Sequence, residues 1–474
     1  MRRDPEHKDP GNLRKGNSNM STASGNSDAI TPHLGPFDIA FFVIAAAAPL
    51  GATLGVAPVV YGAAEYSVTY LFAFASIVLL LFSVGFAYSC RATGGSGGFA
   101  ELIAMGLGRP VGDMAAGISL LAYCAMLAGI VGQIAAFIPL PVGELGGRGW
   151  LVTAAPVLAF VAILGYRRID LSRRFMAIAI ALELLALLVL DASLLLSSTS
   201  HSVGVPTPEF PDFGAPGTAI GLMFAFACFV GFESTALYGE EACDPAKTLP
   251  KATFLAIGTI GIFYGFTMWC LGVAYSNPAL QELTTQDPGA FVPMASLTYL
   301  GPQGTMVIEL LGILSMLAML ISFHNALARY IHQLAGSGLL SRRLHKVHPT
   351  FGSPHVASVT VTILTVAVVF AFGLVGADPV LQLYTWLVGL GTLAIVLIQA
   401  LCAISITAYI VRTKGPTSVA LATSLGGLGL TVAFALFAVN FDMLSGGGVV
   451  TMLLPTLIVV AALATLTLRK PAAA

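Results

Sequence analysis

Three glutamates lie within otherwise apolar runs of this sequence, where a charged group needs a reason. They are Glu183, Glu233 and Glu309. A charged side chain at the centre of a membrane helix costs about 2.5–3.5 kcal/mol on insertion scales. Burial disfavours the charged form of a carboxylate and brings proton binding closer to neutral pH. The three glutamates are therefore candidate proton-binding groups.

Two of these glutamates each have a second interpretation. Glu233 follows Gly231 in MFAFACFVGFESTALYGEE (Met223 to Glu241), where it either binds a coupling proton or only bonds the backbone of an unwound region. Glu183 lies in RFMAIAIALELLALL. It either takes part in ion coupling or bonds the backbone of a neighbouring helix, and both possibilities stay open.

The other ionisable groups give weaker indications of function. Glu309 lies close to the start of its run and is within reach of interfacial water, and we expect Asp38 and Asp191, near the ends of runs, to be interfacial. The six cysteines are scattered, without a CxxC pair, and the histidines lack metal-ligand spacing. No metal and no cofactor is expected.

The elements that position these groups are membrane helices. Of 474 residues, 57% are hydrophobic and 9% are charged, whereas about 25% are charged in soluble domains. Helices of about 20 apolar residues cross a hydrocarbon core of about 30 Å. The sequence predicts an all-α polytopic membrane protein with about twelve such spans, at 36–63, 67–90, 113–138, 150–165, 173–197, 216–239, 251–275, 303–331, 355–375, 379–411, 418–440 and 447–468.

The basic residues predict the orientation of these spans. With a cytoplasmic N-terminus and twelve spans, every one of the 22 Lys and Arg residues except Arg148 falls on the cytoplasmic side, as the positive-inside rule requires. Both termini are then cytoplasmic. Residues 1–34 are polar and are expected to form a disordered tail. The short tails and the lack of targeting signals favour a bacterial plasma or inner membrane.

Other classes of protein are disfavoured by motifs that the sequence lacks. It has no HExxH, no repeated His box, no Ser/His/Asp set at membrane depth and no P-loop. An enzyme and an ATP-driven pump are therefore not expected, and the spans are too apolar for a channel. The expected partners are a small-molecule substrate, a coupling ion and the lipid bilayer, without nucleic acid.

Two of the predicted spans contain residues that break helices. The first places Pro49, Gly51, Gly55 and Pro58 at its centre, and the sixth has small residues and Gly231. Discontinuities in corresponding spans of two halves indicate an inverted-repeat transporter with a substrate site near the midplane. Free N–H groups of a half-helix suit a carboxylate, and free carbonyls suit an ammonium group or a cation. Close helix packing is the alternative explanation.

The loop GEEACDPAKTLPKA, Gly239 to Ala252, follows the sixth span. We expect Pro245 and Pro250 to prevent a continuous helix there. The loop is interpreted either as a cytoplasmic gate that links spans six and seven or as a rigid charged turn.

Four stretches carry a resemblance to a known family. They are PLGATLGVAP (Pro49 to Pro58), GGSGGFAELIAMGLGRPVG (Gly94 to Gly112), FVGFESTALYGEEACDPAKTLPKA (Phe229 to Ala252) and FHNALARYIHQLAGSGLLSRRLHKVHPTFGSPHVA (Phe323 to Ala357). In these stretches the chain resembles the amino acid–polyamine–organocation superfamily, and bacterial amino acid permeases in particular. The resemblance covers 35–411, and the last two spans agree in number and placement only.

The resemblance implies a five-plus-five inverted repeat with spans one and six unwound around the substrate. The transporter core would be 35–411, with repeats at about 35–197 and 216–411, followed by two additional helices and a short tail in 412–474. Backbone amides of the first break would bind the substrate carboxylate, and carbonyls of the sixth would bind its amino group. The implied substrate-binding residues are Leu50, Gly51, Ala52, Thr53, Ala227, Cys228, Phe229, Val230 and Trp386. An apolar side-chain pocket is expected from Phe224, Phe229, Phe232, Tyr123, Met126, Tyr384 and Trp386.

The sequence departs from the family pattern in ways that bear on substrate and coupling. Thr53 stands where the family often has a second glycine, and Ala227 stands where relatives for large cationic substrates carry an aromatic residue. Glu233 matches a glutamate associated with proton sensing in proton-linked relatives. Some of those relatives carry a lysine in span five, where this chain has Glu183, so sodium coupling stays open.

The function predicted from these features is secondary active transport of amino acids by alternating access, with proton symport and with Glu233 and Glu183 in coupling or gating. The alternative is a sodium-coupled transporter or an exchanger of polyamines or other organic amines. A nutrient receptor without transport is the remote alternative.

Overall fold

The computed structural model describes residues 34–92, 98–138, 148–167, 173–200, 206–233, 235 and 242–468. Its helices are α1 (Pro36–Ala47), α2 (Pro49–Ala64), α3 (Val68–Ala92), α4 (Phe99–Leu107), α5 (Arg109–Phe137), α6 (Trp150–Arg167), α7 (Arg173–Ser200), α8 (Pro216–Ala227), α9 (Pro245–Tyr275), α10 (Pro278–Gln286), α11 (Phe291–Gly336), α12 (His355–Leu374), α13 (Thr385–Arg412), α14 (Thr417–Val439), α15 (Phe441–Ser445) and α16 (Val449–Leu468). The only β pairing in these residues is an isolated bridge between Leu34 and Ala242. The predicted all-α polytopic fold is confirmed.

In the described ranges, ten helical segments are long and apolar enough to cross a membrane, judged by length and composition. The two predicted spans without a segment of their own are the two predicted to be broken. The second half of the first span is continuous with the next one in Pro49–Arg91, and the described part of the sixth contains a helix of twelve residues, α8. Residues 1–33, which include most of the predicted disordered tail, lie outside the described residues.

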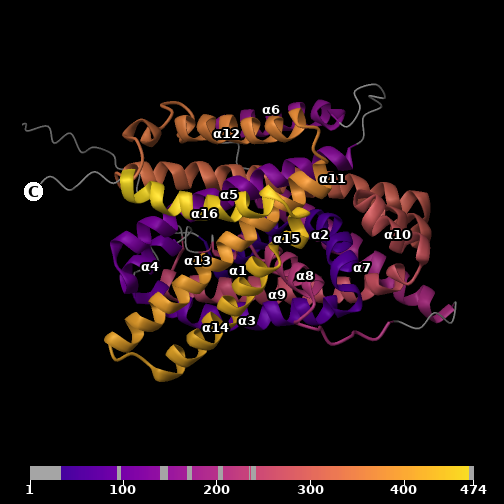
Figure 1. Ribbon diagram of the computed structural model, residues 1–474, viewed down its shortest axis with the longest axis horizontal. Coiled ribbons are helices and arrows are strands. Elements are labelled where there is room, and N and C mark those ends of the chain that lie inside the picture. The colour runs from indigo at the N-terminus through magenta and orange to yellow at the C-terminus, as the bar shows by residue number, and fades with distance from the viewer. Residues whose placement is uncertain are drawn as a thin grey trace, which may run out of the picture. The chain divides into compact units, whose positions relative to one another are not determined.

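The packing of the helices brings the two broken spans together. The helix α2 packs against both α8 and α11, and α7 packs against α9 and α11 (Figure 1). The helix α5, buried along much of its length, packs against α13 and α11. The two additional helices α14 and α16 pack on α3 and α13 and on α5, respectively. The described residues belong to one compact unit.

The start of α9 corrects one expectation from the sequence. The helix runs from Pro245 through Pro250 to Tyr275 without interruption. Pro245 occupies the first turn, where its missing N–H has no helical partner to lose. Pro250 leaves the Ala246 carbonyl without its usual donor, and Arg91 Nε donates to that carbonyl instead at 2.8 Å. A side chain from another helix thus compensates for the proline.

The connection between α9 and the first described residues is formed by backbone. The Cys243 amide donates to the Leu34 carbonyl at 3.0 Å. Next to it, Lys247 lies 3.0 Å from the Asp244 carboxylate and lowers the pKa of that acid. The chain preceding α1 is therefore paired with the segment that leads into α9.

Candidate substrate site at the two broken helices

The first break falls at Ala48, between α1 and α2. Ala48 has φ 46° and ψ 73°, in the left-handed region. Proline restricts the residue before it and has no N–H to donate to α1, so α1 ends and a new helix begins at Pro49. Gly51 therefore lies in the first turn of α2. The break comes earlier than the glycines alone would indicate.

The implied carboxylate-binding residues have different surroundings in this turn. Ala52 N donates to the Ala48 carbonyl at 2.8 Å, as in an ordinary helix. The Thr53 hydroxyl is buried and donates to the Pro49 carbonyl at 2.8 Å, so its proton is already in use. The amides of Leu50 and Gly51 remain, and both are already engaged by side chains.

Glu183 of α7 and Ser315 of α11 close a hydrogen-bonded ring with these two amides. The Gly51 amide donates to Ser315 Oγ at 3.1 Å, and the Ser315 hydroxyl donates to Glu183 Oε2 at 2.6 Å. The Leu50 amide approaches the same Oε2 at 3.5 Å. Glu183 is 4% exposed. A carboxylate thus occupies the positive end of the half-helix α2, which favours negative charge.

The second break follows α8, which ends at Ala227. Residues 228–231 form turns, and Gly231 has φ 113°, a conformation that L side chains rarely adopt. The Gly231 amide donates to Glu233 Oε2 at 2.9 Å, and the Tyr123 hydroxyl of α5 donates to Glu233 Oε1. Glu233 is buried. This glutamate therefore joins the turn to α5.

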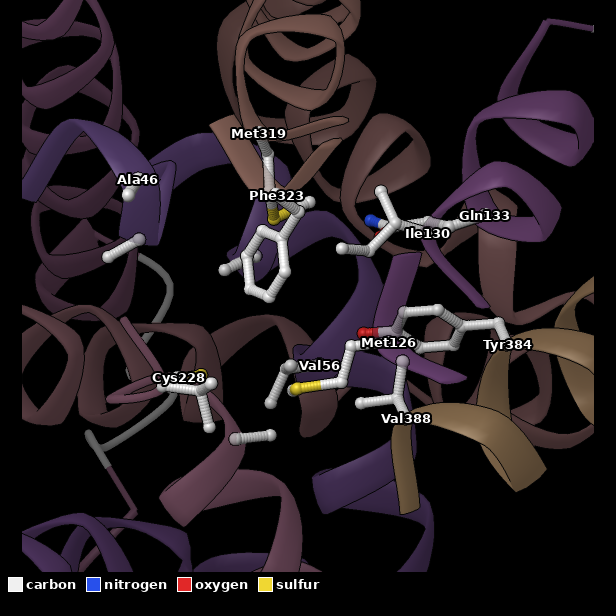
Figure 2. Close-up of a pocket in the computed structure, with 14 residues that line it drawn as sticks. Ala46, Val56, Met126, Ile130, Gln133, Cys228, Met319, Phe323, Tyr384 and Val388 are labelled. Carbon is white, nitrogen blue, oxygen red and sulfur yellow. The ribbon is translucent and has the colours of Figure 1, made fainter. Parts of the chain in front are cut away.

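A cavity of about 40 Å³ lies between the two breaks. Since one water needs about 10–15 Å³ of such space, the cavity has room for a few waters, and a larger ligand requires its walls to move. It is lined by Ala46, Ala47, Ala52, Val56, Met126, Ile130, Gln133, Ala227, Cys228, Val230, Met319, Phe323, Tyr384 and Val388 (Figure 2). None of these described lining residues carries a charge at neutral pH.

Some predicted site residues line this cavity and others do not. Ala52, Ala227, Cys228 and Val230 are part of its wall, as are Met126 and Tyr384 of the predicted apolar pocket. Those outside the lining are Leu50, Gly51, Thr53, Phe229 and Trp386, and from the predicted pocket Phe224, Phe232 and Tyr123. The Trp386 ring packs edge-on against Phe372 with centroids 6.1 Å apart.

Gln133 of α5 is a wall residue that the sequence reasoning missed. Its Nε2 donates to the Gly51 carbonyl at 2.7 Å. A Cβ at Gly55 would lie 2.6 Å from both Gln133 Nε2 and the Tyr384 hydroxyl oxygen, so glycine is needed for these side chains to reach α2. The sequence signal was a lone amide in the apolar run 113–138, opposite a glycine of the first break.

Asp191 is a second buried acid on α7, and the expectation that it is interfacial is wrong. It is 1% exposed, and the Thr267 hydroxyl of α9 donates to its Oδ2 at 2.9 Å. Its Oδ1 has no hydrogen-bond partner among the described residues. The helix α7 extends to Ser200, and this face of it packs against α9, which hides Asp191 from the interface.

Two broken apolar helices surround a small uncharged cavity in this all-α polytopic membrane protein. The family model described as amino acid permease matches residues 34–466. The chain therefore belongs to the amino acid permease family, within the amino acid–polyamine–organocation superfamily.

Several curated proteins are similar to the chain at low identity. The methylthioribose transporter of Bacillus subtilis is 22% identical over 300 residues, 62% of this chain and 59% of the relative. The branched-chain amino acid permease BcaP of Bacillus subtilis is 25% identical over 265 residues, 55% of this chain and 51% of the relative. Cationic amino acid transporter 5 of Arabidopsis thaliana is 27% identical over 168 residues, 35% of this chain and 28% of the relative. Each similarity spans less than two thirds of the relative.

Proposed function

We propose that this protein is a secondary active transporter that moves amino acids across a membrane by alternating access, in symport with protons. The observation that carries the proposal is the cavity shared by the two breaks, with Ala52 from the first and Ala227, Cys228 and Val230 from the second in its wall. Broken helices that meet at a site are the usual construction of such transporters. Family membership supports the amino acid class of substrate.

The substrate's charged groups are assigned to the two breaks. The amides at the start of α2 take the carboxylate, and the carbonyls after α8 take the amino group. The lining, with Met126, Met319, Phe323 and Val388, favours an apolar side chain. Both termini are assigned to the cytoplasm, because the basic residues then lie almost entirely on that side.

Glu233 and Glu183 are assigned to coupling. Both are buried acids, and each bonds backbone at one of the two breaks. Protonation of either group weakens bonds that hold a break in its present geometry, since hydrogen bonds to a charged acceptor are stronger than those to a neutral one.

The test is uptake into proteoliposomes that contain the purified protein. A mixture of labelled L-amino acids is supplied with an inward proton gradient in one set and an inward sodium gradient in the other. Accumulation with the proton gradient alone supports the proposal. Accumulation with sodium alone contradicts proton coupling, and no accumulation of any amino acid contradicts the proposed substrate class.

One observation favours an organic amine as the second candidate substrate. The Leu50 and Gly51 amides are already engaged by Glu183 and Ser315, and a solute without a carboxylate would not have to compete with Glu183 for these amides. Adding polyamines and simple primary amines to the uptake mixture tests this alternative in the same vesicles.

A further inference from the structure

Glu183 holds the donors to which the substrate carboxylate is assigned. Its Oε2 accepts from the Ser315 hydroxyl at 2.6 Å and from the Leu50 amide at 3.5 Å, and Ser315 in turn accepts from the Gly51 amide. All donors in this ring point toward the acid, since backbone amides can only donate. The structure thus shows this turn of α2 already holding a carboxylate.

A second carboxylate cannot join the first without a change in charge. A substrate anion on the Leu50 and Gly51 amides would lie next to Glu183 Oε2 and would take the same donors. Two carboxylates that share one site cannot both remain ionised, and one of them takes up a proton. Glu183 has no ion pair with a basic side chain in the part of the chain that the structure describes, so no cation keeps it charged there.

We propose that Glu183 is an internal competitor of the substrate carboxylate at the first break, so that the substrate binds there only as Glu183 takes up a proton. This inference rests on the proposed function, because it needs a substrate that carries a carboxylate. The proton comes from the water that reaches the open cavity, and it converts the Glu183 carboxylate into the neutral acid. One proton therefore enters the site with each substrate molecule.

The cavity lies next to the residues that take part in this exchange. Ala47 and Ala52, on the two sides of the break, line the cavity, and so does Met319, one turn beyond Ser315. Gln133, another wall residue, bonds the Gly51 carbonyl at 2.7 Å. A ligand in the cavity thus lies against the same turn that Glu183 holds.

Few other titratable groups face Glu183. From α9, Tyr264 is close enough to interact electrostatically with it, and its hydroxyl donates to the Ala47 carbonyl at 3.0 Å. From α2 and α11 the carboxylate meets the Leu50 amide and the Ser315 hydroxyl. Asp38 of α1 bonds the Gly35 amide at the start of that helix. Asp191, two turns along α7, bonds Thr267.

The test measures equilibrium binding to the full-length protein in lipid nanodiscs across a range of pH. The probe is L-leucine, which suits the apolar lining, or the amino acid with the highest uptake in the proteoliposome assay if leucine is not carried. The same amino acid without its carboxylate, 3-methylbutylamine for leucine, is measured in parallel. Glu183→Gln is compared with Glu309→Gln, a matched change at an exposed glutamate of α11.

The parent and Glu309→Gln are expected to lose affinity for the amino acid by about tenfold per pH unit above the pH at which Glu183 ionises, since one proton is linked to binding. Glu183→Gln is expected to lose this tenfold fall in affinity per pH unit and to bind more tightly than the parent at alkaline pH. A second variant, Ser315→Ala, removes a donor from the carboxylate and is expected to move the pH dependence to higher pH without abolishing it.

Three results contradict the account, and they separate its parts. An unchanged pH dependence in folded Glu183→Gln overturns the role of Glu183 and leaves the proposed transport intact. Binding of the amine without binding of the amino acid overturns the competition, because no carboxylate then enters the site. Failure of every amino acid in the uptake assay overturns the proposed function itself.

Discussion

The two broken helices carry glutamates in different ways. At the first break the acid comes from another helix, with Glu183 and the Leu50 amide 133 positions apart in the sequence. At the second break Glu233 bonds the Gly231 amide two residues away and is tied to α5 through Tyr123. An acid from another helix can be exchanged for a ligand carboxylate while its own backbone stays in place. Glu233 lies within its own turn, so it cannot give up its hydrogen bond to the Gly231 amide without a change in the conformation of that turn.

The two breaks also differ in their backbone conformations. Ala48 adopts the left-handed helical region, which costs about 1–2 kcal/mol for an L-residue. Gly231, at φ 113°, is outside the regions that most other residues use. The first break is thus a defined corner between two helices, whereas the second depends on glycine.

The largest difference between the two breaks is expected when the residue with positive φ is changed at each of them. Gly231→Val should destabilise the protein by about 1–3 kcal/mol, because valine is strained at positive φ, and uptake should fall to background. Ala48→Gly should leave stability unchanged or raise it, since glycine enters the left-handed region without steric cost. Thermal unfolding in detergent and uptake in proteoliposomes measure both, and equal effects at the two positions would refute the contrast.

The next effect concerns the acid at the second break. Glu233→Gln keeps an acceptor for the Gly231 amide but loses the charge, so its bond with Tyr123 should weaken from about 1.5–3 to about 0.5–1.5 kcal/mol. We expect uptake driven by the proton gradient to fall several-fold and to lose the part of its pH dependence that comes from Glu233, while the part that comes from Glu183 remains. Initial rates at several pH values are the measurement.

Tyr123→Phe is the matched control for this change, because it removes the same hydrogen bond and keeps the acid. Its uptake should be reduced while its pH dependence remains. If Glu233→Gln transports with the pH dependence of the parent, the second break has no part in coupling.

The sequence predicted the helices and the existence of both breaks, because proline, glycine and apolar length are local signals. It placed the first break across Pro49, Gly51, Gly55 and Pro58. In the structure Ala48 followed by Pro49 makes the corner, and the other three residues lie inside α2. The ring of Glu183, Ser315 and the two amides joins segments more than 130 positions apart. Periodicity does not specify which face of one helix meets which residue of another.

The dependence on packing between helices also explains why some side chains lie elsewhere than the sequence predicted. The expected position of Asp191 failed because only the packing of α7 on α9 decides its exposure. Gln133 and Ser315 reach the first break from α5 and α11. The lone amide of Gln133 in an apolar run was a weak signal, and nothing in the neighbourhood of Ser315 marks it as a site residue. The family resemblance predicted four small residues of the cavity wall, which no property of their own would have indicated. They are Ala52, Ala227, Cys228 and Val230.

The smallest effect is expected at Trp386, which the resemblance assigned to the site. The structure places its ring against Phe372 and outside the cavity lining. Trp386→Phe should leave the apparent affinity within about twofold, as for changes of about 0.5 kcal/mol or less away from special features. The concentration dependence of uptake measures this. A tenfold loss of affinity would show that Trp386 contributes to substrate binding after all.

The proposed transport requires that the two breaks enclose the substrate. A cryo-electron microscopy structure of the protein in nanodiscs with the transported amino acid at saturating concentration tests it most directly. We expect ligand density between Ala52 and the Ala227–Val230 turn, with the ligand carboxylate on the amides at the start of α2 and Glu183 displaced from them. Ligand density elsewhere, with the ring of Glu183, Ser315 and the α2 amides intact, would contradict it.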